Sequence, residues 1–259
     1  MAEPSRPPAE RGPATLGVTA AERAADERSQ LAVAVLDRAT GELAVGARGN
    51  ESFYAASLSK IVLAVDILDR RRYEGLTVTE TDLDLIRRAL GPSDDSAMNV
   101  LWTRFDGVGA AARVSPRAGL TGTTAPHDRS QWGEMTTTAA DVTRLWGYVL
   151  EVMLPEDGAF IVDAMATAPP LARDGFDQRF GLLAPAITGP GGPGAVAKQG
   201  WMCCLGGQYY LHSAGVLGAD RRFVVAVLAR LPRDGGWEAA RAEVTEIATA
   251  AARGLGLVT

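Results

Sequence analysis

The chain has 259 residues, 47 % of them hydrophobic, which is enough for one large domain with an ample core. Its formal charge of −5 gives no basic footprint for nucleic acid, and no apolar run approaches the roughly 20 residues that span a bilayer. The N-terminal stretch has no apolar signal-peptide core, so the sequence leaves the compartment open: cytoplasm, or export with the signal already removed.

The first part of the chain predicts a leader, a helix and a hairpin. Residues 1–18 are rich in Pro, Ala, Arg and Gly, which is typical of a disordered leader, and we place a single domain at 19–259. Residues 20–29 favour a helix. Residues 30–49 contain two strand-like runs around a turn at 38–41, where a Thr-Gly pair indicates a β-hairpin.

The next segment carries a short motif that could perform chemistry. From Leu58 onward apolar residues recur at helical spacing, which predicts a buried helix ending near residues 70–73. Ser57 opens it, and Lys60 follows one turn later on the same face. A serine hydroxyl becomes nucleophilic when a base takes its proton, and a lysine can do so where burial lowers its pKa. The alternative is that Ser57 only caps the helix.

The middle of the chain is predicted to be helical. Gly91-Pro92 ends one helix, and Ser93 or Asp94 caps the next. A long irregular return is expected at 171–194. The helices are expected within residues 76–90, 93–105, 107–120, 136–154 and 155–170, with a polar loop at 121–135.

The last part predicts a β-meander at 195–230, with glycine-rich turns, and a closing amphipathic helix at 237–257. We therefore predict an α/β (α+β) fold, in which the N-terminal hairpin and the meander form one antiparallel sheet. N- and C-terminal helices flank this sheet, and an all-helical lobe is inserted. The sheet lobe comprises 19–56 and 190–259, and the helical lobe comprises 57–189.

The cysteines and histidines do not indicate a metal site. Cys203 and Cys204 are adjacent, and neighbouring strand residues point to opposite faces, so we expect packing residues without a disulfide between them. His127 and His212 are too few for a typical histidine-based zinc site. We predict neither a metal nor a cofactor.

Lysine is rare in this chain. Of the 26 basic residues only Lys60 and Lys198 are lysine, and the other 24 are arginine. Arginine stays protonated in proteins, whereas lysine can lose its proton. The two lysines are therefore candidates for positions that need a titratable or compact ammonium group.

Three motifs occur in a fixed order: Ser57-Leu58-Ser59-Lys60, Ser93-Asp94-Asp95 and Lys198-Gln199-Gly200. They resemble the S-x-x-K, S-D-N and K-T-G signatures of the serine β-lactamase and penicillin-binding-protein superfamily, most closely its class A β-lactamases. The flanking stretches SDDSAMN and EMTTTAADV resemble the family as well, and the resemblance covers residues 20–257. It implies a monomeric serine hydrolase that cleaves a small lactam, amide or ester through an acyl-enzyme. Proteins of this type are usually exported.

The resemblance also implies a role for each motif residue. Ser57 would be the nucleophile and Lys60 its proton acceptor. Ser93 would relay a proton to the leaving nitrogen, and Lys198 would hold Ser93 and attract a substrate carboxylate. The backbone N–H groups of Ser57 and Trp201 would form an oxyanion hole.

Two motif positions depart from the family pattern. Asp95 stands where the family has asparagine; an ionised carboxylate only accepts hydrogen bonds, and its pairing with Lys60 would keep that lysine protonated. Gln199 replaces a threonine that helps to bind the substrate carboxylate. Asp95, Gln199, Gly200 and Trp201 are the expected substrate-binding residues; the alternative for Trp201 is a packing residue, the more common role of an aromatic near a sheet edge.

The loop at 121–135 is shorter than its class A counterpart and lacks the E-x-x-N pattern, whose glutamate activates the deacylating water. Asp128 is the candidate to replace it, the alternative being a solvated turn around Asp128; Glu134 lies too late in the loop. His212 either faces the cleft as an anion-binding residue or is a hydrogen-bonded histidine of the sheet. The missing glutamate leaves two further functions open. One is a penicillin- or ligand-binding protein that acylates without efficient turnover, and the other is an amidase or acyltransferase for a substrate other than a β-lactam.

Overall fold

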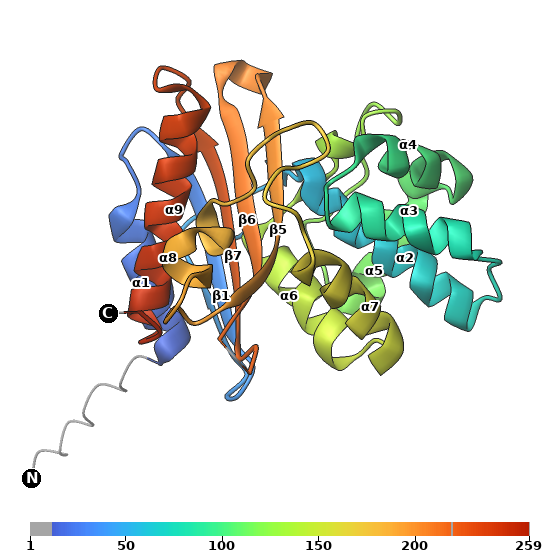
Figure 1. Cartoon of the computed structure of the whole chain (residues 1–259), viewed down its shortest axis with the longest axis horizontal. Coiled ribbons are helices and arrows are strands. Elements are labelled where there is room, and N and C mark those ends of the chain that lie inside the picture. Colours follow the sequence, from blue (N-terminus) through green and yellow to red (C-terminus); the bar gives the residue numbers. More distant parts are fainter. Residues whose placement is uncertain (1–11, 219, 259) are drawn as a thin grey trace, which may run out of the picture.

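The computed structural model describes residues 12–218 and 220–258, and its centre is a five-stranded antiparallel sheet (Figure 1). The strand order is β2-β1-β7-β6-β5, so the N-terminal hairpin joins the C-terminal meander as predicted. β5 is an edge strand, and its free edge faces the helical part of the molecule. The strands are β1 (Gln30–Asp37), β2 (Glu42–Val45), β5 (Ala195–Cys203), β6 (Tyr209–Leu217) and β7 (Phe223–Leu231).

One face of the sheet is covered by the two terminal helices, α1 (Pro13–Ala24) and α9 (Gly236–Gly254), which pack side by side (Figure 1). The prediction placed the first helix at 20–29 and a disordered leader at 1–18. That boundary is wrong, because the helix begins at Pro13, a residue whose fixed φ suits the first helical position. Residues 1–11 of the predicted leader lie outside the described residues.

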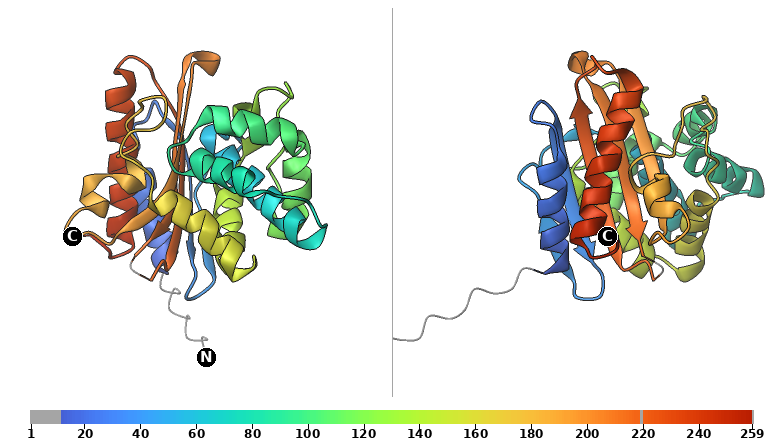
Figure 2. Two further views of the ribbon diagram at one scale, coloured as in Figure 1. Left: turned by 45° about the vertical axis from the view of Figure 1, so that its right-hand side comes forward. Right: turned by 60° about the vertical axis from the view of Figure 1, so that its left-hand side comes forward.

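The other face carries the helical lobe, in which α6 packs directly on the strands (Figure 2). Its helices are α2 (Ser59–Tyr73), α3 (Glu80–Leu90), α4 (Asp95–Arg104), α5 (Ala110–Ala118), α6 (Ala139–Glu151) and α7 (Pro155–Ala166). The short elements around them are the 3-10 turns at 56–58, 107–109 and 132–134 and the two-residue strands β3 (Phe53–Tyr54) and β4 (Thr136–Thr137). Within the described residues, no helix combines the length and apolarity that a bilayer crossing requires.

Two separate cores follow from the alternation of side chains along the strands. In β1, Val33 and Val35 point into the core beneath α1 and α9. Ala32 and Ala34, on the opposite face, belong to the core shared with α2 and α6. The small alanines let α6 approach the sheet closely.

The boundary of the helical lobe differs from the prediction. Residues 171–189 were assigned to that lobe, but the segment returns across the sheet to the α9 face. There Phe180, Leu182 and Ile187 are buried in the core of the terminal helices, and α8 (Pro185–Thr188) contacts α9 (Figure 1). The apolar residues of this segment follow neither a helical nor a strand period. The sequence therefore does not indicate which face of the sheet the segment covers.

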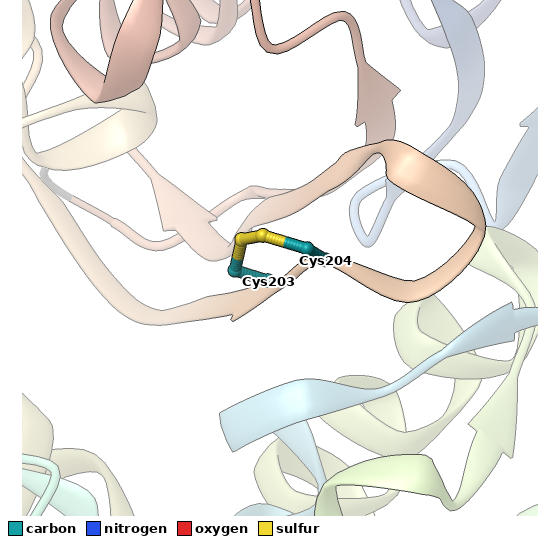
Figure 3. Close-up of a disulfide and its surroundings, with 2 residues drawn as sticks. All are labelled: Cys203 and Cys204. Atoms are coloured by element: carbon teal, nitrogen blue, oxygen red, sulfur yellow. A yellow bond between two sulfur atoms is a disulfide. The ribbon is translucent and has the colours of Figure 1, made fainter.

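The cysteine prediction is also wrong. Cys203 and Cys204 form a disulfide at the end of β5, where the hairpin to β6 begins (Figure 3). The prediction assumed that both residues lie in a strand and point to opposite faces, whereas β5 ends at Cys203 and Cys204 lies beyond it. Both side chains are exposed, so they are not packing residues either.

Candidate active site

Ser57 lies in a tight 3-10 turn, Ala56–Leu58, immediately before α2. The turn is anchored from both sides: the N–H of Ala55 donates to the carbonyl of Met135 (2.6 Å), and Ser59 Oγ donates to the carbonyl of Ala56 (2.8 Å). Ala56 itself has φ +46°, a strained conformation for a residue with a side chain. The fold thus holds Ser57 in a defined position, only 5 % exposed.

Lys60 follows one turn later in α2, and its side chain is buried. Its Nζ donates to Oδ1 of Asp95 (2.6 Å), to the carbonyl of Ser93 (2.8 Å) and to Oγ of Ser93 (3.1 Å). Burial lowers the pKa of Lys60, and the charge of Asp95 opposes that shift. In the part of the chain that the structure describes, no hydrogen bond joins Ser57 Oγ to Lys60.

Ser93 connects the two lysines. It precedes α4 and has φ +55°, a left-handed conformation that is uncommon outside glycine. Lys198 Nζ donates to Ser93 Oγ (2.8 Å) and to the carbonyl of Gln199 (2.8 Å). Lys198 is fully buried, and its pKa lies well below the ordinary value because of that burial and of the charge of Lys60.

The segment before α4 is fixed by its cap. Asp94 accepts hydrogen bonds from the backbone N–H of Ser96 (2.9 Å) and of Ala97 (3.2 Å), so it is the cap, and the alternative, Ser93, is free for the site. Asp95 is the first helical residue, and its side chain is 61 % exposed at the mouth of the cleft. The N-cap at Asp94 therefore fixes the positions of its two neighbours, Ser93 and Asp95.

The edge strand β5 brings Lys198 to Ser93 and Gly200 to the serine turn. A Cβ on Gly200 would lie 3.3 Å from the carbonyl oxygen of Ala55 and 3.4 Å from the N atom of Ser57, so the missing side chain allows the strand to approach the serine turn closely. Trp201 is one of the residues that line the cleft, and its indole Nε1 donates to Oδ2 of Asp174 (3.0 Å).

The structure does not place Gln199 in the cleft. Its Nε2 donates to the carbonyls of Gln178 (3.0 Å) and Phe180 on the opposite side of the strand. Successive strand residues point to opposite faces, so with the side chain of Lys198 directed to Ser93 that of Gln199 points to the other face. The substrate-binding role predicted for Gln199 is therefore replaced by a structural one.

The loop at 121–135 contributes a residue that the sequence reading missed. The ring of Trp132 lies over Lys60, with its centroid 4.8 Å from Nζ, and its Nε1 donates to Oδ1 of Asn99 (2.8 Å). Trp102 pins the same loop by donating to the carbonyl of Arg129 (2.9 Å). A tryptophan followed by a glycine is unusual in a polar loop. This pair, Trp132 and Gly133, is the sequence signal that could have indicated that the loop lines the cleft.

Asp128 is not among the residues that line the cleft. It accepts hydrogen bonds from the backbone N–H (2.9 Å) and Oγ (2.8 Å) of Ser130, and the backbone bond is the main cause that lowers its pKa. A lower pKa makes a carboxylate a weaker base. The geometry supports the turn alternative and gives no support to Asp128 as the water-activating residue.

His212 is a histidine of the sheet, as one of the two alternatives predicted. Its Nδ1 accepts a hydrogen bond from the N–H of Ala229 (3.2 Å), which leaves Nε2 to donate to the carbonyl of Tyr54 (2.8 Å). The ring is fully buried, and this burial lowers the pKa of His212 to about 4. His212 therefore does not offer a charged group to the cleft.

These elements enclose a cleft of about 410 Å³. Its only lining carboxylate among the described residues is Asp95. The described part of the chain also holds no cluster of three or more His, Cys, Asp or Glu side chains suited to a metal ion. The lining residues are Ala56, Ser57, Asp95, Asn99, Ser130, Gln131, Trp132, Gly133, Trp201 and Met202.

Comparison with solved structures assigns the fold. A β-lactamase from Sphaerobacter thermophilus superposes with a TM-score of 0.73 at 18 % identity, covering 94 % of this chain and 98 % of the other. The TLA-1 extended-spectrum β-lactamase gives 0.74 at 13 % identity, covering 93 % and 98 %. PBP-A gives 0.69 at 17 % identity, covering 91 % and 95 %. The fold is therefore that of the serine β-lactamases and penicillin-binding proteins, as the motifs predicted.

Sequence comparison assigns the family. The chain is 34 % identical over 231 residues to the proteins named "Putative lipoprotein LppW" of Mycobacterium tuberculosis and Mycobacterium bovis, covering 88 % of this chain and 71 % of theirs. The chain belongs to the LppW family. No family model matches it.

Proposed function

We propose that this protein is a serine hydrolase that forms an acyl-enzyme on Ser57 and cleaves a small lactam, amide or ester. One observation carries the proposal: Lys60 Nζ and Lys198 Nζ lie 3.1 Å and 2.8 Å from the same oxygen, Ser93 Oγ, beside the cleft that Ser57 lines. The only two lysines of the chain thus converge on one hydroxyl. A structural role would need neither the convergence nor the burial of two ammonium groups.

In the acylation step, Ser57 Oγ attacks the substrate carbonyl carbon, and its proton passes to the neutral form of Lys60. Burial of Lys60 favours that neutral form. The backbone N–H groups of Ser57 and Trp201 hold the negative oxygen of the tetrahedral intermediate. The C–N or C–O bond then breaks, the leaving group takes a proton through Ser93 Oγ, and a Ser57 ester remains.

The second step releases the acyl group. A water molecule attacks the ester carbon, the bond to Ser57 Oγ breaks, and the serine regains its proton while a carboxylic acid leaves. This step needs a base for the water. Asp95, held by Lys60, is the one carboxylate at hand in the described cleft.

The structural neighbours support the acyl-enzyme chemistry. They include several β-lactamases, and one variant of PBP-A has been solved as an acyl-enzyme complex with penicillin G. Their identity to this chain is low, so the support for this protein comes from its own site geometry together with the shared fold.

A second candidate function is acylation without efficient turnover, as in a penicillin-binding protein. Two observations favour it. The loop at 121–135 brings no carboxylate to the cleft, and the ring of Trp132 lies over Lys60. In this case the Ser57 ester would persist or pass its acyl group to another acceptor.

The experiment is to incubate the purified protein with benzylpenicillin and to follow its intact mass, with Ser57→Ala as control. An adduct on Ser57 that disappears as penicilloate accumulates supports the hydrolase, and a persistent adduct supports the second candidate. An adduct that forms equally in Ser57→Ala would refute both. If no adduct forms, a panel of amides and esters tests the remaining alternative, an amidase or acyltransferase for another substrate.

A further inference from the structure

A second pocket lies beside the Ser57 cleft, on the same face of the sheet. It has a volume of about 300 Å³ and no role in the mechanism described above. We call it the Arg230 pocket, and it is lined by Ser52, Phe53, Tyr54, Thr136, Tyr210 and Arg230.

The Arg230 pocket and the cleft are lined by neighbouring residues of the same segments. Tyr54 lines the pocket, and Ala56, two residues later, lines the cleft. Tyr210 of the pocket is paired across β5 and β6 with Met202 of the cleft. The segment 133–136 borders both as well. The two cavities are therefore neighbours, and these residues lie between them.

Arg230 brings an uncompensated positive charge to this pocket. Its guanidinium lies 4.2 Å from the centroid of the Phe53 ring and 5.5 Å from that of Tyr210. It donates to neutral acceptors only, Oε1 of Gln30 (3.1 Å) and the carbonyl of Ser52. Within the described residues no carboxylate pairs with it, and its buried Nε has no acceptor. Such a partly buried charge favours an anion as its partner.

The other polar groups of the pocket can also donate hydrogen bonds. Ser52, Tyr54, Thr136 and Tyr210 supply hydroxyls, and no carboxylate is among the lining residues. Burial raises the pKa of Tyr210, so its phenol keeps the proton at neutral pH. The rings of Tyr54 and Tyr210, with centroids 5.4 Å apart, add an apolar wall. A donor-rich, partly aromatic pocket suits an organic carboxylate.

We propose that the Arg230 pocket binds a carboxylate on the acyl side of the substrate. That the carboxylate belongs to a substrate rests on the proposed acyl-enzyme at Ser57. Binding of a carboxylate in the pocket does not depend on that proposal. Lys198 and Arg230 then recognise two different ends of one ligand, the leaving-group end and the acyl end, with Ser57 between them.

The first test measures binding without chemistry. Adipate, a small dicarboxylate, is titrated into the Ser57→Ala protein by calorimetry, and its neutral analogue adipamide serves as the matched probe. Adipate should bind at least about tenfold more tightly than adipamide, and Arg230→Gln should remove about tenfold of its affinity. Arg230→Lys, which keeps the charge, should retain part of it, and the exposed Arg72→Gln should change nothing.

Three results would overturn the proposal: no measurable binding of adipate, equal binding of adipamide, or unchanged adipate affinity in Arg230→Gln. A purely structural role for Arg230 predicts the last of these together with a lower melting temperature. Thermal unfolding of each variant is therefore recorded alongside. Residual binding at Lys198 is common to all variants and does not affect the comparison.

The second test uses acylation. Carbenicillin differs from benzylpenicillin by one carboxylate on the acyl side chain, so the ratio of their acylation rates reports on the anion site. Arg230→Gln should lower the carbenicillin-to-benzylpenicillin ratio severalfold, and an unchanged ratio contradicts the substrate assignment. If neither compound acylates Ser57, the proposed function fails, while the adipate titration still decides whether the pocket binds a carboxylate.

Discussion

The Nζ atom of Lys60 lies 2.6 Å from Oδ1 of Asp95, and this ion pair sits at the point where the motif departs from the S-D-N pattern. Burial of Lys60 favours the neutral amine, whereas the negative charge of Asp95 favours the ammonium. The pair therefore sets the pH at which Lys60 can accept the proton of Ser57.

Replacement of Asp95 by asparagine should move the acidic limb of the acylation profile to lower pH. The amide removes the charge that raises the pKa of Lys60, so the neutral amine exists at lower pH. The measurement is the rate of Ser57 adduct formation with benzylpenicillin against pH. At high pH, where Lys60 is neutral in both proteins, the rates should converge. A limb that stays in place or moves upward would show that Asp95 does not control Lys60.

Ser93 should be essential for breaking the leaving-group bond. Removal of its hydroxyl deprives both lysines of their shared acceptor, and we expect acylation to fall by about 10²-fold or more. Ser93→Gly and Ser93→Ala form a matched pair. At φ +55° the glycine variant should be more stable by roughly 1 kcal/mol, because only alanine retains the strained Cβ.

Stopped-flow acylation and urea unfolding of the two Ser93 variants separate these effects. Both should acylate equally slowly although their stabilities differ. If Ser93→Gly acylated Ser57 as fast as the parent protein, the Ser93 hydroxyl would have no role in proton transfer.

Trp132 should lengthen the life of the acyl-enzyme. Its ring lies over Lys60, and we expect it to hinder the approach of water to the Ser57 ester from this side. Trp132→Ala opens that side and should shorten the adduct half-life severalfold. Trp132→Phe keeps an aromatic cover but loses the hydrogen bond to Asn99, so it should stay close to the parent protein. The half-life is read from intact mass after excess penicillin is removed. Equal half-lives in all three proteins would exclude a shielding role.

The motif residues could be found from the sequence because local signals position each of them. Ser57 and Lys60 are one helical turn apart, and the Asp94 cap orients Ser93. The antiparallel order of the sheet then places Lys198 on the edge strand. The helical spacing of Ser57 and Lys60 is visible in the sequence, whereas Ser93 and Lys198 were assigned through the resemblance to the S-D-N and K-T-G signatures.

Trp132 and Arg230 could not be found in this way, because their roles depend on contacts between distant segments. Trp132 is held at the site by its hydrogen bond to Asn99 on α4, and the guanidinium of Arg230 lies over the ring of Phe53. The misassignment of Gln199 has a different cause. Its motif position was matched to a substrate-binding threonine, without regard to the alternation of side chains along β5.

Gln199 should contribute to stability rather than to catalysis. Its Nε2 holds the carbonyls of Gln178 and Phe180, so Gln199→Ala leaves two buried acceptors without their donor. We expect a loss of about 1–3 kcal/mol in the free energy of unfolding. Acylation per folded molecule should change little, since the side chain points away from the cleft. Urea unfolding and acylation rates test this, and a normal stability with slow acylation would return Gln199 to the substrate site.

His212 should make the protein less stable in mild acid. In the folded protein its burial lowers the pKa to about 4, whereas the unfolded chain titrates at the ordinary value of about 6.5. As the pH falls from about 6.5 towards 4, the unfolded chain takes up a proton that the folded protein does not bind. The free energy of unfolding should therefore fall across this window by at most about 1.4 kcal/mol per pH unit. His212→Gln should flatten the slope between those pH values, although it also lowers stability at pH 7. An unchanged slope in His212→Gln, measured by urea unfolding at several pH values, would assign the acid sensitivity to carboxylates instead.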